Sequence, residues 1–445
     1  MTVRITPEWV CDITGIRKEE RHAMRITILA IGSRGDVQPL LALAVGLQQT
    51  GRHKIRFAAP DNFESLAREH CLDFFPLGVN TQELMGAGEL KAGIESGRNF
   101  LLWFWQLLNT IRPVLDLLLE RTWLSCQDAE TIIYSTIGIG AYHVAEKLGV
   151  PCCIATPIPG LAPTRAYPNP GGVFPSLRLG GGYNLLTHFL SGQILQALTG
   201  PYINRWRQEH LHLPPIPFGK YPYGQLHGQP LPVLGSYSSI VVPRPPDWGE
   251  HIHITGYWFL DPAPNWQPPA RLVDFLESGS PPVYIGFGSM VSRTPRQATQ
   301  LVREALARSG QRGVLATGWG GLDGADLPAN LYMLDSVPHA WLFPRVSAVV
   351  HHGGSGTTGA GLCAGVPSVL VPHFGDQPFW AQRVTELGVG PKPIPRRQLT
   401  AERLAAAITS AITDTDMQAR AAALGERIRT EDGVGQAIRI IERCN

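Results

Sequence analysis

The sequence lacks the cysteine spacing of a disulfide-stabilised or zinc-binding protein. Its 445 residues contain seven cysteines, at positions 11, 71, 126, 152, 153, 363 and 444, and no two of them form a C-x-x-C pair. An odd number of scattered cysteines argues against a disulfide framework. The sequence therefore predicts a protein of a reducing, cytoplasmic compartment.

An excess of charge of either sign is also missing. The chain has 38 Lys and Arg residues against 36 Asp and Glu residues, which gives a formal net charge of +2. A chain so balanced has no electrostatic reason to bind nucleic acid, so any anion must be held by local donors. We expect no nucleic-acid partner.

Long uninterrupted apolar runs are absent. Residues 1–23 mix acidic and basic side chains, lack the apolar core of a secretory signal and are taken as an N-terminal extension. The most apolar stretch, Phe100 to Trp123, is broken by Arg112, Asp116 and Glu120, short of the roughly 20 apolar residues that a membrane span needs. Its apolar residues have the spacing of one buried helix face, at positions 101, 104, 108, 111, 115 and 118.

What the sequence does contain is two successive α/β patterns. The first pattern opens with a β-loop-α-β unit. This unit consists of a strand over Arg25–Ile31, a turn over Gly32–Asp36, a helix over Val37–Thr50 and a strand over Lys54–Ala59. Further strands are predicted at Thr131–Tyr134, Cys152–Ala155 and Ile240–Val242. The Pro- and Gly-rich region 157–184 is too long for a plain connector and is a candidate binding loop.

The second pattern follows a proline-rich linker at residues 261–270. Its predicted strands lie within Pro282–Ser289, Arg312–Thr317, Leu331–Leu334, Ala348–Val350 and Ser368–Val371. The chain is long enough to bury two cores. We therefore predict an α/β protein of two Rossmann-like, doubly wound domains that face each other across a cleft. They comprise residues 24–260 and 271–424, and a C-terminal helix within 425–445 packs back on the first domain.

The run from His351 to Thr358, which reads HHGGSGTT, directly follows an apolar stretch at 346–350. This pattern predicts a buried strand, a tight loop and a helix over Thr358–Ala364. Glycine lets the backbone approach a ligand, Ser and Thr add hydroxyl donors, and a helix start favours negative charge. The loop is therefore predicted to hold a phosphate or diphosphate.

Polar groups also follow two other predicted strands of this half, at Gly288–Ser289 and at His373–Gln377. Ligands of open α/β sheets bind beyond the carboxyl ends of the strands, so these loops are expected to converge. A diphosphate cradle beside the Asp376 carboxylate and the Gln377 amide suits a nucleotide sugar. The N-terminal half supplies Asp36 from the opposing loop.

Four ordered segments carry a specific resemblance: GSRGDVQPLLALAVGL, VYIGFGSM, SVPHAWLFPRVSAVVHHGGSGTT and AGVPSVLVPHFGDQPFWA. They resemble the family 1 glycosyltransferases of the GT-B fold, and are most similar to the sterol 3-β-glucosyltransferases and the vancomycin-type antibiotic glycosyltransferases. The resemblance covers Met24 to about Pro393. It implies inverting transfer of a sugar, glucose above all, from a UDP-sugar to a hydroxyl of a lipophilic acceptor such as a sterol, without metal or cofactor.

The resemblance also implies residue roles. Asp36 would be the base that accepts the proton of the acceptor hydroxyl, with Ser33 close to the reacting centre, and Asp376 and Gln377 would hold the sugar hydroxyls. The residues that would bind the diphosphate are Ser289, His352, Gly353, Gly354, Ser355, Gly356 and Thr357. Ser336 stands where the plant signature has a Trp that stacks on uracil, so the base site would depend on Ser336 and Val337, and thymidine remains open beside uridine.

The acceptor needs an apolar trough, and the best candidate is Trp103, Phe104 and Trp105 with the 157–184 loop. Aromatic groups of this kind more often belong to the hydrophobic core of a domain than to a binding site. The same surface is expected to make a peripheral contact with a membrane that stores the acceptor.

Simpler interpretations stand beside these. Asp36 and Asp376 each occupy a place where an Asp caps a helix, and one of His351 and His352 is expected to be structural. Asp414-Thr-Asp416 mimics a metal-binding D-x-D motif but lies between two helical patterns, so we favour a cap. No metal site is predicted, because the His pairs at 251/253 and 351/352 lack Cys or carboxylate neighbours.

Other functions remain open at this point. The acceptor could be a polyketide, phenolic or antibiotic aglycone. A GT-B-fold UDP-sugar epimerase would need neither the GSRGD loop nor an apolar trough. A silent sugar-nucleotide binder would have no use for both Asp36 and the Asp376–Gln377 pair.

Overall fold

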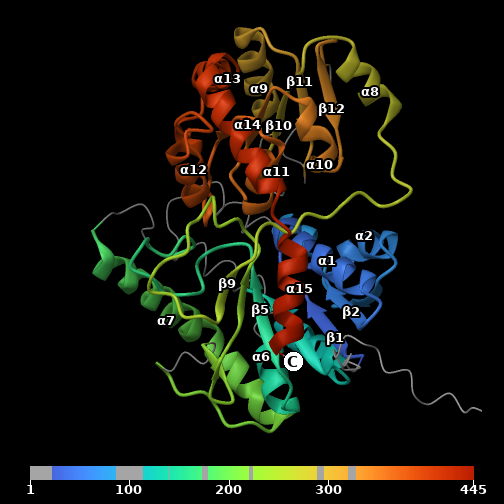
Figure 1. The fold of residues 1–445 in the computed structure, drawn as a ribbon, viewed down its shortest axis with the longest axis vertical. Coiled ribbons are helices and arrows are strands. Elements are labelled where there is room, and N and C mark those ends of the chain that lie inside the picture. The colour runs from blue at the N-terminus through green and yellow to red at the C-terminus, as the bar shows by residue number, and fades with distance from the viewer. Residues whose placement is uncertain are drawn as a thin grey trace, which may run out of the picture.

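The computed structural model describes residues 23–86, 114–138, 140–172, 179–219, 224–287, 295–318 and 327–444. Two α/β domains stand end to end, with the N-terminal domain in blue and green and the C-terminal domain in yellow to red (Figure 1). Each domain is built on its own parallel sheet, as the alternation of strands and helices predicts.

The sheet of the N-terminal domain has seven strands in the order β3-β2-β1-β4-β5-β8-β9, all parallel. Its strands are β1 (Arg25–Leu29), β2 (Lys54–Ala59), β3 (Asp73–Pro76), β4 (Thr131–Ser135), β5 (Cys152–Thr156), β8 (Val233–Gly235) and β9 (Ile252–Ile254). Every residue of the central strands β4 and β5 is buried, because helices cover both faces of a parallel sheet.

The helices of this domain connect the strands and supply one side of the cleft. They are α1 (Arg34–Gln49), α2 (Glu64–Glu69), α3 (Thr81–Gly86), a helix over 114–126, α6 (Gly140–Leu148) and α7 (Gly181–Trp206). A 3-10 turn (Asp61–Phe63), a π-helical turn (Arg207–Leu211) and a small hairpin of β6 (Gln225–Leu226) and β7 (Gln229–Pro230) complete it.

The C-terminal domain has a five-stranded parallel sheet in the order β12-β11-β10-β13-β14. Its strands are β10 (Val283–Gly286), β11 (Gly313–Ala316), β12 (Leu331–Leu334), β13 (Ala348–His351) and β14 (Ser368–Leu370). Its helices are α8 (Ala270–Glu277), α9 (Pro295–Ser309), α10 (His339–Leu342), α11 (Ser355–Ala364), α12 (Gln377–Glu386), α13 (Ala401–Thr413) and α14 (Thr415–Arg429), with 3-10 turns at Phe343–Arg345 and Arg396–Gln398. The strand order reverses between β10 and β13, and ligands of such sheets bind at that point.

The last helix, α15 (Gly433–Cys444), leaves the C-terminal domain and lies beside α1 (Figure 1). Its buried Ala437, Ile438 and Ile441 belong to the hydrophobic core of the N-terminal domain. The first residue of α15 packs closely against the chain just before the proline-rich linker: a side chain at Gly433 would place its Cβ 2.4 Å from the carbonyl oxygen of Tyr257. The chain therefore passes between the domains twice, while the domain boundaries given above stay predictions.

The predicted strand at Ile240–Val242 is wrong. These residues form a turn, and Val241 and Val242 are buried against Leu370 and Trp380 of the other domain. An apolar β-branched run is typical of a strand, but here the burial comes from the interface between the domains. The strands β8 and β9 take the sheet edge instead, and their three-residue length gives little pattern to detect.

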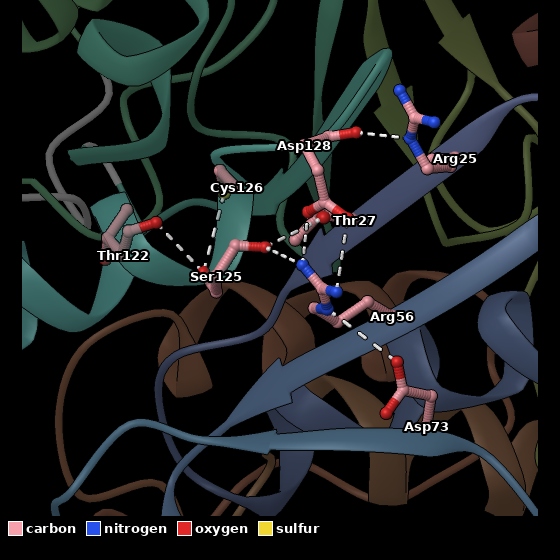
Figure 2. A network of polar contacts seen from close by, with 8 residues as sticks. All are labelled: Arg25, Thr27, Arg56, Asp73, Thr122, Ser125, Cys126 and Asp128. Carbon is pink, nitrogen blue, oxygen red and sulfur yellow. Dashed lines mark hydrogen bonds and ion pairs between the residues drawn. The ribbon is translucent and has the colours of Figure 1, made fainter.

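A polar network fixes the helix at 114–126 to the amino ends of the strands, away from the cleft (Figure 2). Arg56 donates to the carbonyl of Ser125 (3.1 Å) and to the carboxylate of Asp128, and Thr27 also donates to the Ser125 carbonyl. The hydrogen bond from Arg56 lowers the pKa of Asp128. A guanidinium at a helix C-terminus satisfies carbonyls that have no intrahelical partner. The network thus anchors a helix whose other end lines the cavity described next.

Candidate active site

One cavity of about 1790 Å³ lies between the two domains. It is lined from both sides, and among its lining residues are Ser33, Asp36, Ser336, Val337, His352, Gly354, Ser355, Gly356, Thr357, Asp376 and Gln377. Gly353 is not among them. Ser289, Trp103, Phe104 and Trp105 lie outside the described residues. The fold thus brings most of the predicted site residues into one space, although they come from four separate loops.

Asp36 is held by its own helix start. The helix α1 begins earlier than predicted, at Arg34, with Ser33 as N-cap, so Asp36 is the third residue of the helix and not its cap. Its Oδ2 accepts hydrogen bonds from the backbone nitrogen (2.8 Å) and the hydroxyl (2.9 Å) of Ser33. This is a capping-box arrangement, and it fixes the carboxylate in one orientation.

The second oxygen of Asp36, Oδ1, has no hydrogen-bond partner within the described chain, and Asp36 lines the cavity. Burial raises the pKa of Asp36, against the opposing effect of the Ser33 hydrogen bonds. Gly32 has φ +138°, and a Cβ there would lie 2.5 Å from Oδ2. Only glycine therefore allows this turn to close on the carboxylate.

The predicted diphosphate loop is largely the first turn of α11. This helix begins at Ser355, not at Thr358, and its N-cap Gly354 has no side chain to cap it. The first backbone N–H groups of a helix have no intrahelical acceptor, and those of Gly356 and Thr357 belong to residues that line the cavity. The hydroxyl of Ser355 is committed elsewhere, because it donates to the carbonyl of Pro157 in the other domain (2.8 Å). Ser355 can therefore donate to a ligand only through its backbone N–H.

The two adjacent histidines have different environments. His351 is fully buried, does not line the cavity, and its Nδ1 accepts the N–H of Gly353 (3.1 Å). His352 lines the cavity, and its buried Nδ1 has no partner within the described residues. Burial lowers the pKa of His352 to about 4, so the ring is neutral near pH 7. Of the two, His352 is the one placed to contact a ligand.

We expect UDP binding to be linked to proton uptake by His352. A bound diphosphate favours the imidazolium and raises the pKa of His352 above about 4. Affinity should therefore increase as the pH falls through the pKa of the complex. The variant His352→Ala should bind UDP about tenfold more weakly and take up no proton.

Titration calorimetry in two buffers of different ionisation enthalpy measures both effects. His210→Ala, which removes an exposed histidine outside the cavity, serves as the control. Unchanged proton uptake in His352→Ala would contradict the assignment.

Asp376 and Gln377 begin α12, but their side chains act differently. Asp376 occupies the N-cap position without a side-chain capping bond, and its Oδ2 accepts from the Trp380 indole nitrogen (2.7 Å). Burial and then the charge of Asp36 raise the pKa of Asp376 to about 7. The charge of Asp36 thus acts on Asp376 within the cavity. Gln377 is buried, and its Oε1 accepts from the backbone nitrogens of His373 (2.7 Å) and Phe374 (3.2 Å), which holds the turn.

At the predicted base site, Ser336 and the buried Val337 follow β12 and line the cavity. The hydroxyl of Ser336 accepts a hydrogen bond from Nη1 of Arg34, which belongs to the other domain (3.1 Å). Sequence reasoning missed Arg34. The one available signal was its place beside Asp36 in the GSRGD loop.

The N-terminal wall of the cavity is apolar. It includes Leu115, Leu118, Leu119, Ile158, Leu161, Phe189, Ile194, Leu195, Leu198 and Tyr202. Much of it belongs to α7, which sequence reasoning also missed. The first half of α7 buries polar residues: Asn184 donates to the carbonyl of Arg165 (2.7 Å), and the Thr187 hydroxyl accepts from the Asn169 backbone nitrogen (2.8 Å). These bonds fasten the 157–172 loop, so the apolar side chains of α7 are left to line the cavity.

The D-x-D pattern is a helix cap, as favoured above. Asp414 is the N-cap of α14, and its Oδ1 accepts from the backbone nitrogen of Met417 (2.8 Å). Within the described ranges no group of three or more His, Cys, Asp or Glu side chains is arranged to hold a metal ion.

Comparison with known proteins agrees with this architecture. Residues 26–167 match the glycosyltransferase family 28 N-terminal domain, and residues 319–433 match the erythromycin biosynthesis protein CIII-like C-terminal domain. Two solved structures share the fold over 95% of this chain and 99% of their own: the glycotransferase of kitacinnamycin, with TM-score 0.69 at 18% identity, and the glycosyltransferase VinC in complex with DTDP, with TM-score 0.63 at 17% identity. The predicted GT-B fold is confirmed.

Curated relatives are closer in sequence. A sterol 3-beta-glucosyltransferase of Arabidopsis thaliana is 38% identical over 440 residues, which cover 96% of this chain and 67% of the relative. One of Cryptococcus neoformans is 39% identical over 444 residues, which cover 94% of this chain. The match spans only 27% of that fungal protein. The chain belongs to the sterol 3-beta-glucosyltransferase family of GT-B glycosyltransferases.

Proposed function

We propose that this protein transfers glucose from UDP-glucose to the hydroxyl of a sterol-like lipophilic alcohol and forms a β-glycoside. A single observation carries the proposal: one interdomain cavity joins an oriented carboxylate, an uncapped helix start and an apolar wall. The carboxylate suits the acceptor hydroxyl, the helix start suits the diphosphate, and the apolar wall suits the body of the acceptor.

In the proposed reaction the acceptor hydroxyl gives its proton to Oδ1 of Asp36. Its oxygen forms a bond to the anomeric carbon of glucose while the bond from that carbon to the diphosphate oxygen breaks on the opposite side. The departing diphosphate takes the electron pair, and the N–H groups at the start of α11 and the ring of His352 stabilise its charge. Proton transfer is expected late, because an Asp is a weak base for an alcohol until the new bond acidifies the hydroxyl.

The sugar would lie between the two carboxylates. We assign to Asp376 the role of accepting hydrogen bonds from glucose hydroxyls, because its side chain lines the cavity and its other contact is the Trp380 indole. Gln377 would act mainly by holding the turn at residues 373–374, since its Oε1 is occupied there.

The size and lining of the cavity favour a large acceptor. Ligand pockets typically measure about 300–1,000 Å³, and 1790 Å³ leaves room for a nucleotide sugar and a second bulky molecule. The apolar wall supplied by α7 suits a rigid hydrocarbon skeleton, and the relatives at 37–39% identity are named for sterol glucosylation. A sterol is therefore preferred over a phenolic or polyketide aglycone.

An acceptor panel tests the proposal. UDP-glucose is incubated with a sterol, a flavonoid, a macrolide aglycone or no acceptor, and UDP release is measured. We expect release only with acceptor and fastest with the sterol, and a β-glucoside as the product. Preference for the flavonoid or macrolide would reassign the acceptor, isomerised sugar without acceptor would indicate an epimerase, and UDP binding without turnover would indicate a silent binder.

The peripheral membrane contact stays a prediction. Within the described chain no helix is both long and apolar enough to cross a membrane. The helix α7 exposes Leu186, Phe189 and Leu190, with 49%, 59% and 41% of their surface accessible, and Phe189 also lines the cavity. Because α7 also lines the cavity, this surface would place the acceptor entrance next to a lipid bilayer.

A further inference from the structure

Arg34 is a cation in the cleft with no anionic partner among the described residues. Its Nη1 donates to the Ser336 hydroxyl (3.1 Å) and its Nε donates to the side-chain oxygen of Gln38 (3.0 Å), and both groups are neutral. Desolvation in the cleft lowers the pKa of Arg34, although its side chain stays accessible from the cavity, and the charges of Tyr284 and Glu69 offset this only in part. A guanidinium in this position is suited to an anionic ligand.

The position of Arg34 follows the expected path of the nucleotide. The next residue, Gly35, faces the start of α11: a Cβ on Gly356 would lie 3.9 Å from the Cα of Gly35. The other end of the Arg34 side chain reaches Ser336, at the predicted base site. Its side chain thus runs from the diphosphate end of the cavity towards the base end, and it comes from the domain opposite to the one that carries both.

No other arginine or lysine among the described lining residues is placed to do the same. The lining includes one further arginine, Arg429, which donates to the carbonyl of Cys363. Cys363 lies near the C-terminal end of α11, roughly 12 Å along the helix axis from Ser355 at 1.5 Å per residue. Asp36 and Asp376 add negative charge to the same space. A departing diphosphate therefore needs a cation beside the start of α11, and Arg34 is the residue that can supply it.

We propose that Arg34 binds the diphosphate of the donor from the acceptor domain, exchanging its hydrogen bond to Ser336 for hydrogen bonds to phosphate oxygens when the UDP-sugar enters. This inference rests on the proposed function and adds a donor-binding residue in the opposite domain. The planar guanidinium can contact phosphate oxygens through two N–H groups at once. A donor held from both sides joins the two domains, so the site is complete only when the cleft is closed over it.

The test compares UDP and uridine, which lacks the phosphates, as calorimetric probes. Arg34→Met is expected to weaken UDP binding by about tenfold or more and to reduce the dependence of UDP affinity on salt, while uridine affinity stays as in the wild type. Arg34→Lys keeps the charge but loses the planar, two-donor geometry of the guanidinium, so its UDP affinity should lie between those of Arg34→Met and the wild type. Arg68→Met, which removes an exposed charge on α2 outside the cavity, should bind UDP as the wild type does.

The outcomes separate this inference from the proposed function. If the wild type bound no UDP, the proposed function itself would fail. If the wild type bound UDP and Arg34→Met bound it equally well, only the role of Arg34 would be overturned. An equal loss of UDP and uridine affinity would also overturn it, because the residue would then act on the base. Thermal unfolding of each variant confirms that it is folded, which is expected because Arg34 is exposed to the cavity and packs in no core.

Discussion

Replacing Asp36 with Asn is expected to lower the turnover of sugar transfer by about 10²- to 10⁴-fold. The amide can still accept the hydrogen bonds of Ser33, so the start of α1 should remain intact, but it cannot accept the proton of the acceptor hydroxyl. UDP release measures turnover, and calorimetry should show nearly unchanged UDP affinity. Asp416→Asn, an exposed change of the same kind in α14, should have wild-type turnover. Full activity of Asp36→Asn would remove the base assignment.

The pH dependence of turnover should also show that Asp36 acts as the base. Asp36 must be ionised to act as a base, and burial raises its pKa. Turnover should therefore fall as the pH drops through a value above the ordinary range of an Asp, about 3.9. The charge of Asp36 contributes to the raised pKa of about 7 of Asp376, so Asp36 is already ionised when Asp376 titrates. Asp376 is then neutral where Asp36 takes up its proton, and Asp376→Asn should leave this acid limb in place, whatever it does to the plateau. A limb that moves to lower pH would show that Asp36 titrates beside a charged Asp376.

The largest effect on stability is expected from Arg207→Met, which should lower the free energy of unfolding by about 3–5 kcal/mol. Arg207 is 2% exposed and follows the end of α7. It donates to the Glu146 carboxylate (2.5 Å) and to the Pro214 carbonyl (2.9 Å), and lies 2.8 Å from Nδ1 of His143. Methionine replaces the volume but removes the guanidinium that Glu146 and His143 both contact. Chemical denaturation measures the change.

The neighbouring Arg205 provides a matched control. It forms an exposed ion pair with Asp116 (3.4 Å), so Arg205→Met should cost only about 0–1 kcal/mol. An equal loss of unfolding free energy in the two variants would show that the buried Arg207 contributes no more to stability than the exposed Arg205.

The dependence of stability on acidic pH tests the same contact between Arg207 and Glu146. Burial by itself raises the pKa of Glu146, but hydrogen bonds from His143 and Arg207 outweigh it and lower the pKa to about 2. A depressed carboxylate pKa stabilises the fold above the unfolded value, and this contribution is lost as the pH falls from about 4.5 towards 2. In Arg207→Met the loss should be smaller and complete at a higher pH, because the pKa of Glu146 then lies nearer to its unfolded value.

The chemistry of the donor side and much of the fold could be predicted from the sequence, because both depend on local pattern. Apolar β-branched runs mark the five strands of the C-terminal sheet, and the HHGGSGTT run places a glycine-capped helix start after one of them. The exact helix starts were missed: α1 begins at Arg34 and α11 at Ser355, because caps from Ser33 and Gly354 extend each helix by almost one turn. The roles of the individual site residues stay predictions.

Only the tertiary structure decided which residues share the cavity and what each side chain is free to do. The contact between Arg34 and Ser336 joins positions 302 residues apart, and the Ser355 hydroxyl is occupied by Pro157 of the other domain. The helix α7 has no sequence signature of a cavity wall, because the residues that its first half buries are polar and serve a loop, and its buried apolar residues, Ile203 and Trp206, lie near its end. Sequence pattern reports a residue's local conformation and its average burial, whereas the partner that buries it is chosen by the packing of distant elements.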